Sequence, residues 1–307
     1  MSSEQSVIRQ INFQGLKIGG EGVNVTDIYF STSHVVEAGK NDTACPYFAL
    51  ELNIFDFDAS SHIVKDYYGE KKPIKLVQKA QESNCDILAL KFNISEENVD
   101  ENILRAKTLL AELLPHIKKP LIIRGMNNKS VDVKLLPALM EVLDREVIVA
   151  FADENTYKEF VPPVVKGGHI LVIRTPIDIN LAKEMNILTT DMGLSPDRIL
   201  IDTDMGGLGY GLEYGYSIME RIKLAAFDGD EMLNMPLIAF AGEEALKAKE
   251  AKSDTFSKSF GDFKTRSLMY EITTASAVIA AGANIVVLEH PKSVEILNKL
   301  LRHAEFI

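Results

Sequence analysis

Eight short, β-rich apolar runs recur from Tyr47 onward, and each is followed by a turn and then by a segment with helical periodicity. The runs span residues 47–56, 86–93, 120–126, 147–154, 169–176, 199–205, 236–244 and 283–291. After the second run, Ile103, Ala106, Leu110 and Leu113 recur at the spacing of one helix face. Nearly continuous apolar strands that alternate with amphipathic helices are typical of a parallel sheet whose two faces are both buried.

Eight strand–helix units predict a closed (βα)8 barrel, the TIM barrel. The alternative is an open, doubly wound sheet, which usually has a Gly-rich dinucleotide turn after its first strand. Here the first run continues as NIFDFDASS, which contains no glycine. We therefore predict an α/β barrel over residues 47–307. Residues 246–265 are predicted to form a longer seventh connection, with a helix, a polar break and the start of a second helix.

Residues 1–46 differ from the barrel region and are predicted to form an N-terminal extension. Residues 7–25 alternate apolar and polar side chains around Gly19 and Gly20, which predicts a small antiparallel β-hairpin. The first ten residues lack the apolar core of a signal peptide, and no stretch approaches about 18 consecutive apolar residues. We therefore expect no membrane span and a cytoplasmic location.

Charge and cysteine content narrow the classes of function. The chain has a formal net charge of −11 and no basic stripe, so nucleic acid and anionic membranes are poor partners. Its two cysteines, Cys45 and Cys85, belong to no CxxC pair, whereas an iron–sulfur cluster needs about four thiolates. Both cysteines precede strands, at the rim opposite the expected site, and are predicted to be small buried thiols. This chain alone therefore holds no disulfide framework and no iron–sulfur cluster.

In a (βα)8 barrel, function gathers where the carboxyl ends of the strands meet the βα loops. The polar and sulfur-bearing residues expected at this rim are Asp56, Asn93, Arg124, Met126, Asn127, Asp153, Glu154, Arg174, Thr175, Asp202, Asp204, Glu243, Glu244, Glu289 and His290. The last four include carboxylates and an imidazole that suit acid/base chemistry. No nucleophile motif accompanies them, so no catalytic residue is assigned.

The most unusual stretch follows the sixth strand and reads IDTDMGGLGYGLEYGYS over residues 201–217. It is not a nucleotide loop, because Leu212 stands where GxGxxG needs glycine and also where the P-loop needs lysine. Asp202 and Asp204 would face the same way on a strand, and with Asp153 and Glu243 they would suit a divalent ion. The favoured interpretation is that Asp202 hydrogen-bonds to a neighbouring strand and Asp204 caps the loop, since no histidine accompanies them.

The same stretch carries a family resemblance. DTDMGGLGYGLEYGYSIMERIKLAA, followed by LNMPLIAFAGEEALKAKEA, resembles the small (delta) subunit family of the corrinoid iron–sulfur protein, part of the acetyl-CoA decarbonylase/synthase system. The resemblance extends from about Phe48 to Leu301. It implies a (βα)8 barrel related to pterin-binding methyltransferases. It also implies a large partner subunit that carries a [4Fe–4S] cluster and a corrinoid domain, with the cobalamin covered by the carboxyl end of this barrel.

The resemblance further implies a role in the reductive acetyl-CoA (Wood–Ljungdahl) pathway. The methyl group would come from methyl-tetrahydrofolate, or in archaea from a methanopterin, through a separate methyltransferase and pass to acetyl-CoA synthase/CO dehydrogenase. No histidine lies in the D-x-H-x-x-G pattern that ligates cobalt, so the corrinoid would be carried by the partner. On this basis the residues expected to contact cobalamin are Asp204, Gly206, Gly207, Leu208, Gly209, Tyr210, Arg124, Thr175 and Glu243.

Two alternatives stay open at this point. In the first, the chain is itself a pterin-dependent methyltransferase and binds methyl-tetrahydrofolate inside its barrel. The residues that would hold the pterin are Asn93, Asn127, Asp153 and Asp202. In the second, the chain is a metal-dependent lyase that uses Asp202, Asp204 and Glu243. The resemblance favours a non-catalytic or co-catalytic subunit of a methyl carrier over both.

Overall fold

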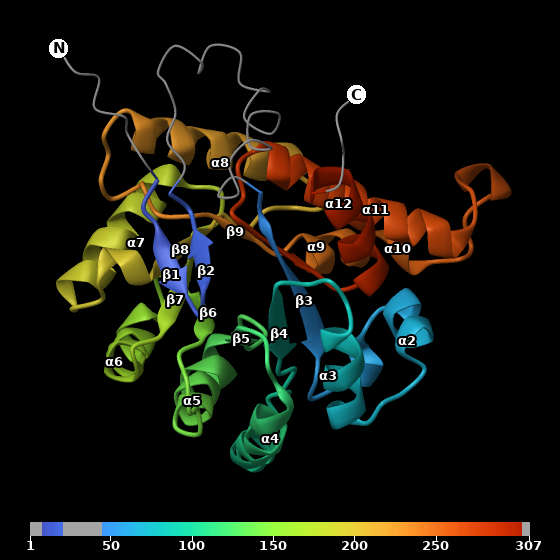
Figure 1. The fold of residues 1–307 in the computed structure, drawn as a ribbon, viewed down its shortest axis with the longest axis horizontal. Helices are drawn as coiled ribbons and strands as arrows, with labels where there is room; N and C mark the ends of the chain where they lie inside the picture. Colours follow the sequence, from blue (N-terminus) through green and yellow to red (C-terminus); the bar gives the residue numbers. More distant parts are fainter. Residues whose placement is uncertain (1–7, 21–44, 303–307) are drawn as a thin grey trace.

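The computed structural model describes residues 8–20 and 45–302. Its main body is a ring of eight parallel strands surrounded by helices (Figure 1). The strands are β3 (Tyr47–Asn53), β4 (Ile87–Lys91), β5 (Leu121–Arg124), β6 (Ile148–Ala152), β7 (Ile170–Arg174), β8 (Ile199–Asp202), β9 (Ile238–Ala239) and β10 (Ile285–Leu288). A parallel bridge between Ile201 and Leu237 joins β8 to β9 and closes the ring. The predicted (βα)8 barrel is therefore confirmed.

Helices cover the outside of the ring. They are α2 (His62–Tyr68), α3 (Pro73–Gln81), α4 (Val99–Leu113), α5 (Lys129–Met140), α6 (Tyr157–Gly167), α7 (Ile179–Asp191), α8 (Leu212–Phe227), α9 (Ala241–Lys247), α10 (Lys249–Lys252), α11 (Phe263–Ala280) and α12 (Pro291–Arg302). The predicted helical face in α4 is buried as expected. The seventh connection contains α9, α10, a polar break and α11, as predicted. None of the described helices is long and apolar enough to cross a membrane.

The strands alternate between two separate cores. Side chains such as Leu50 and Leu88 point outward and pack under the helices. Side chains such as Ala49, Ile87 and Leu200 point inward and fill the lumen. Because every residue of β4 to β8 is buried, the period of two that marks a half-exposed strand is absent from the sequence.

The N-terminal hairpin is present, but its turn is not where we predicted it. β1 (Ile11–Phe13) and β2 (Leu16–Ile18) pair antiparallel around a turn at Gln14 and Gly15, both at positive φ. A two-residue hairpin turn of this kind needs two left-handed residues, which explains the position of the turn. Gly19 and Gly20 lie just after β2. The ends of the predicted segment, residue 7 and residues 21–25, lie outside the described residues.

The hairpin contributes apolar side chains to the lumen. Ile11, Phe13 and Ile18 belong to the same buried cluster as the inward residues of the barrel strands. The backbone N–H of Lys17 donates to the Tyr47 hydroxyl at the start of β3. The hairpin therefore fills the amino-terminal end of the barrel, and the opposite end is left for a site. The division of the chain at residue 46 stays a prediction.

The two cysteines differ in burial. Cys85 is buried, and burial raises the pKa of its thiol. Cys45 is only partly buried, so the prediction of two buried thiols is correct for one of them. Both precede their strands and lie away from the carboxyl-terminal rim.

Candidate functional site

A layer of charged side chains closes the upper lumen. Its members occupy the inward positions that follow the apolar lumen residues along the strands: Glu51 on β3, Lys91 on β4, Arg124 on β5, Arg174 on β7 and Asp202 on β8. All five residues are buried. Buried charges are costly unless they are paired, so the pairing in this layer decides what it can do.

Arg124 is bound by two carboxylates. Its Nε and Nη2 donate to the two oxygens of Glu51, at 2.5 and 2.7 Å, and Nη2 also donates to Glu243 at the start of α9. Lys91 and Lys247 each lie 3.1 Å from the same Glu243 carboxylate. Burial alone would raise the pKa of Glu243, but these three cations outweigh it and hold the pKa well below its usual range. Glu243 is therefore ionised and engaged, and it is not a free acid or base.

Arg174 forms the second ion-pair group. Its Nε donates to Asp202 at 2.7 Å, and its Nη1 lies 3.2 Å from Asp204. The guanidinium lies 3.4 Å from the centre of the Phe151 ring, a cation–π contact. Burial raises the pKa of Asp202, and Arg174 counteracts this. The favoured interpretation of Asp202, a hydrogen bond to a neighbouring strand, is confirmed.

The metal interpretation does not fit this arrangement. β8 ends at Asp202, and Asp204 has a positive φ of 50°, so strand alternation does not place their side chains. Both carboxylates instead contact Arg174. Within the described ranges, no three or more His, Cys, Asp or Glu residues are grouped so as to hold a metal ion.

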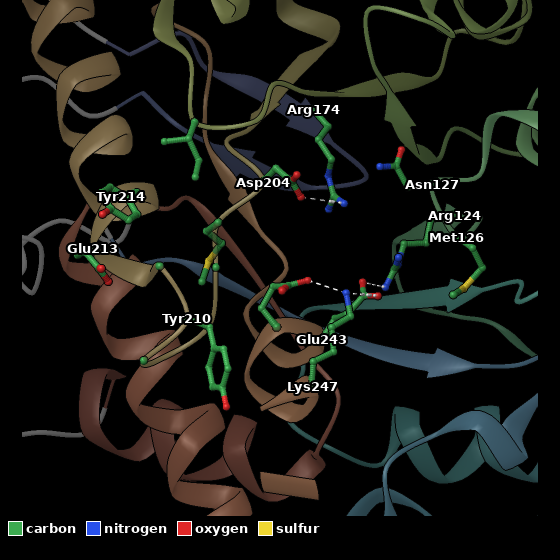
Figure 2. Close-up of a pocket in the computed structure, with 16 residues that line it drawn as sticks. Arg124, Met126, Asn127, Arg174, Asp204, Tyr210, Glu213, Tyr214, Glu243 and Lys247 are labelled. Carbon is green, nitrogen blue, oxygen red and sulfur yellow. Dashed lines mark hydrogen bonds and ion pairs between the residues drawn. The ribbon is translucent and has the colours of Figure 1, made fainter. Parts of the chain in front are cut away.

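A cavity of about 720 Å³ lies at this end of the barrel, where Arg174 and Arg124 reach toward the same space from different strands (Figure 2). Its walls come from the loops after β5, β7 and β8, from the start of α8 and from α9. The lining residues are Arg124, Met126, Asn127, Arg174, Ile177, Asp204, Met205, Gly206, Gly209, Tyr210, Gly211, Glu213, Tyr214, Glu243, Glu244 and Lys247. The site thus combines a charged, internally paired floor with a rim of small, aromatic and aliphatic residues.

Most of the residues predicted to contact cobalamin meet at this cavity. Six of the nine line it, namely Asp204, Gly206, Gly209, Tyr210, Arg124 and Glu243. Three do not. Thr175 is fully buried, Leu208 packs against the core between barrel and helices, and Gly207 packs against the backbone of Glu244.

The glycines after β8 have steric roles in the rim loop. A Cβ at Gly206 would lie 2.2 Å from the Tyr210 carbonyl oxygen, and one at Gly207 would lie 2.6 Å from the Glu244 carbonyl oxygen. The loop can therefore pack closely on itself and on α9. α8 begins only at Leu212, so Tyr210 precedes the helix and does not share a helical face with Tyr214. Both tyrosines are nevertheless exposed at the cavity, by 52% and 61%.

The residues predicted to bind a pterin or to act as acid/base groups do not all lie at this cavity. Of the four proposed pterin contacts, Asn127 lines the cavity and Asp202 lies beside it under Arg174. Asp153 instead accepts hydrogen bonds from Thr156 and from the backbone of Asn155, and Asn93 does not line the cavity. The acid/base candidates after β10 are also outside it.

His290 in particular has a structural role. Its Nδ1 accepts a hydrogen bond from the Lys292 N–H, and its ring packs against Tyr67. Burial lowers the pKa of His290 to about 4, so it is neutral near pH 7. It is not poised as a base at the cavity.

Sequence reasoning missed several residues of the site. Glu51 and Lys91 lie inside apolar runs. Each follows an inward-facing alanine, Ala49 or Ala89, by two residues, and this spacing could have indicated that the charged side chain also faces the lumen. Neither the expected rim residues nor the expected cobalamin contacts include the lining residues Ile177, Met205, Gly211, Glu213, Tyr214 and Lys247. Ile177 and Met205 lie three residues beyond their strands, and the others lie at or within the start of α8 and at the end of α9, where the sequence does not show how the chain folds back over the barrel.

Comparison with known proteins identifies the family. The family model of the CO dehydrogenase/acetyl-CoA synthase delta subunit matches residues 54–303. The chain belongs to this family. The prediction drawn from the loop after the sixth strand is therefore confirmed.

The relatives are delta subunits from archaea. The acetyl-CoA decarbonylase/synthase complex subunit delta of Methanopyrus kandleri is 30% identical over 206 residues, which cover 66% of this chain and 51% of the relative. That of Methanocaldococcus jannaschii is 28% identical over 223 residues, which cover 72% of this chain and 54% of the relative. The chain thus spans about half the length of these relatives.

Solved structures support the fold. A dihydropteroate synthase from Xanthomonas albilineans superposes with a TM-score of 0.59 at 10% identity, over 86% of this chain and 94% of the other. The Yersinia pestis enzyme also gives a TM-score of 0.59, at 11% identity, over 96% and 98% of the two chains. At such low identity the likeness shows the barrel fold alone.

Proposed function

We propose that this chain is the small subunit of a heterodimeric corrinoid iron–sulfur methyl carrier of the reductive acetyl-CoA pathway. The carboxyl end of its barrel covers the cobalamin that a larger partner subunit carries. Membership of the delta-subunit family is the observation that carries this proposal. The methyltransferase that loads the carrier and the acetyl-CoA synthase/CO dehydrogenase that unloads it are the further partners, in the cytoplasm.

The composition of the chain supports a division of labour between two subunits. Two cysteines cannot hold a [4Fe–4S] cluster alone, and no histidine lies in a D-x-H-x-x-G pattern. Both the cluster and the corrinoid therefore belong to the partner. When bound, the cobalamin supplies a cobalt that accepts and gives up a methyl group.

The rim cavity fits a large, flat ring with polar edges. Gly209 lines the cavity, and a Cβ built on it would meet nothing within 4 Å, so a ring can approach the backbone closely. Tyr210 and Tyr214 offer rigid surfaces that combine an aromatic face with a hydroxyl. Below them, Arg124 and Arg174 are already paired with carboxylates. This chain's part is therefore to bind the ring, to orient it and to exclude water from it.

Replacing Tyr210 with alanine is expected to weaken binding of the cobalamin-loaded partner subunit by about tenfold or more, because exposed tyrosines at an interface often contribute strongly. The Tyr210 hydroxyl donates to the half-buried Glu250 in a solvent-exposed hydrogen bond, so the fold should tolerate the change. Affinity would be measured by biolayer interferometry, with Leu104→Ala on α4 as the control, since Leu104 is 65% exposed. Unchanged affinity and unchanged oxidation of cobalt(I) in the Tyr210 variant would remove the rim loop from the proposed interface.

A second candidate function is pterin-dependent methyl transfer by this chain itself. It is favoured by Asn127, which lines the cavity, because a barrel of the same fold, a dihydropteroate synthase from Xanthomonas albilineans, has been solved in complex with 7,8-dihydropteroate. The isolated chain would be titrated with methyl-tetrahydrofolate by calorimetry, beside Asn127→Asp. Binding by the isolated chain that the substitution reduces at least tenfold favours the enzyme. No binding by the isolated chain favours the subunit.

A further inference from the structure

Left-handed residues that carry a side chain are concentrated around the rim cavity. Within the described residues, five side-chain-bearing positions have positive φ, namely Gln14, Asn98, Asn127, Ile177 and Asp204. The last three line the cavity, and each comes from a different loop, after β5, β7 and β8 respectively. Strained backbone of this kind persists only where the surrounding structure fixes it, and it is frequent at ligand sites.

Ile177 is the most unusual of the three. Asparagine and aspartate adopt the left-handed region fairly often, but a β-branched side chain there is a genuine outlier. Its φ is 48°. Its side chain is 40% exposed, so burial in the chain's own core does not compensate for the strain.

Hydrogen bonds fix the backbone on both sides of Ile177. Before it, the Thr175 N–H donates to the Asp202 carbonyl oxygen at 2.9 Å, and the Ile177 N–H donates to the Thr203 carbonyl oxygen at 3.1 Å. After it, the Asp178 side chain caps α7 by accepting from the N–H groups of the second and third helical residues, at 2.8 and 3.1 Å. The extension of β7 and the helix cap together determine where Ile177 stands.

Ile177 also differs chemically from its surroundings on that side of the cavity. Arg174 and Asp204, which line the same cavity, form an ion pair. A glycine or asparagine would meet the backbone requirement at lower cost. An exposed aliphatic group held there at the expense of stability suits contact with an apolar surface that arrives from outside the chain.

We propose that Ile177 is a binding residue of this chain, whose strained backbone presents an aliphatic side chain to the apolar face of the corrinoid ring. This inference rests on the proposed function. The inference adds to the site an aliphatic residue from the loop after β7, whereas the residues after β8 are aromatic. The ring is thus contacted by an aliphatic group as well as by tyrosines.

The test compares two glycine variants that relieve the same kind of strain. Ile177→Gly removes the aliphatic group at the cavity, and Gln14→Gly acts in the N-terminal hairpin turn, at φ 47°. We expect both to keep the thermal midpoint of the free chain or to raise it by about 2 °C. Ile177→Val keeps an aliphatic contact and serves as the conservative variant.

Binding is then measured against the partner subunit with and without cobalamin, and the ratio of the two affinities isolates the corrinoid contact. Ile177→Gly should lower that ratio about tenfold, while Gln14→Gly leaves it unchanged and Ile177→Val stays within about threefold. A wild-type ratio preserved in Ile177→Gly overturns the inference. So does a midpoint that falls by more than about 5 °C, since Ile177 would then support the fold. A wild-type chain that binds loaded and empty partner equally well contradicts the proposed function instead.

Discussion

Replacing Arg124 with methionine is expected to lower the free energy of unfolding by about 3–5 kcal/mol, because it leaves two carboxylates in the lumen without their guanidinium. The side chains of Arg124 and Glu51 are 1% and 2% exposed, and that of Glu243 is 11% exposed. Methionine fills similar space, so the effect measures the lost pairing rather than a large cavity. Thermal unfolding followed by circular dichroism should show a fall of roughly 10 °C.

Two further variants separate the pairing from other causes. Glu243 keeps Lys91 and Lys247 in the Arg124 variant, so Glu51 is the carboxylate left without its cation. Adding Glu51→Gln removes that charge and should recover more than half of the loss. Arg105→Met on the exposed face of α4 serves as the matched control and should change stability by less than about 1 kcal/mol. A single Arg124 variant that unfolds within about 1 kcal/mol of wild type would contradict the paired floor described for the cavity.

The barrel was predictable because its physics is local and repeated. Each strand is a short apolar run, and each is followed by a longer segment whose apolar residues recur at helical spacing. The length of a segment and the period of its apolar residues therefore suffice to tell a strand from a helix. β9 shows the limit of this approach. The seventh run was predicted over residues 236–244, but the strand covers only Ile238–Ala239 and a helix begins at Ala241. That early helix brings Glu243 over the lumen, where it meets Arg124.

The site was predictable only in part, because it depends on pairing across the barrel. The sequence places Arg124 and Glu243 at the rim, but their contact spans 119 residues of chain. The hairpin turn at Gln14 and the strain at Ile177 are backbone conformations that cannot be predicted from the residue types. Glutamine and isoleucine are poor left-handed residues, so propensity argues against both positions. Tertiary hydrogen bonds outweigh that preference.

Replacing Glu289 with glutamine is expected to reduce the loss of stability that the wild-type chain shows as pH rises. Burial, and then the nearby Glu51 carboxylate, raise the pKa of Glu289 to about 8, against an ordinary value of 4.5. Burial likewise raises the pKa of Glu271 to about 7, although hydrogen bonds from Ser293 and two backbone N–H groups oppose it. Between about pH 5 and pH 7 both carboxyls therefore remain protonated in the folded chain, whereas in the unfolded chain they have lost the proton.

The direction of the pH effect follows from this difference. Between about pH 5 and pH 8 the folded chain binds more protons than the unfolded chain, so stability falls as pH rises through that window. His290 acts in the opposite sense below about pH 6.5, because its lowered pKa makes the folded chain bind fewer protons there. The two carboxyls outweigh the single histidine, so stability is still expected to fall as pH rises from about 5, less steeply below pH 6.5 than above it.

Glu289→Gln removes one source of the alkaline decline and leaves that of Glu271. Relative to wild type, the variant should gain on the order of 2 kcal/mol between pH 5.5 and pH 8.5, less than the full pKa shift implies because Glu289 is only partly shielded from solvent. Urea unfolding at both pH values would measure it, with the exposed Glu112→Gln on α4 as control. Equal alkaline slopes in wild type and Glu289→Gln would mean that Glu289 is ionised in the folded chain. The lumen would then carry an additional negative charge beside Lys91, and its charged layer would not be neutralised as the pairing of Arg124 and Glu243 implies.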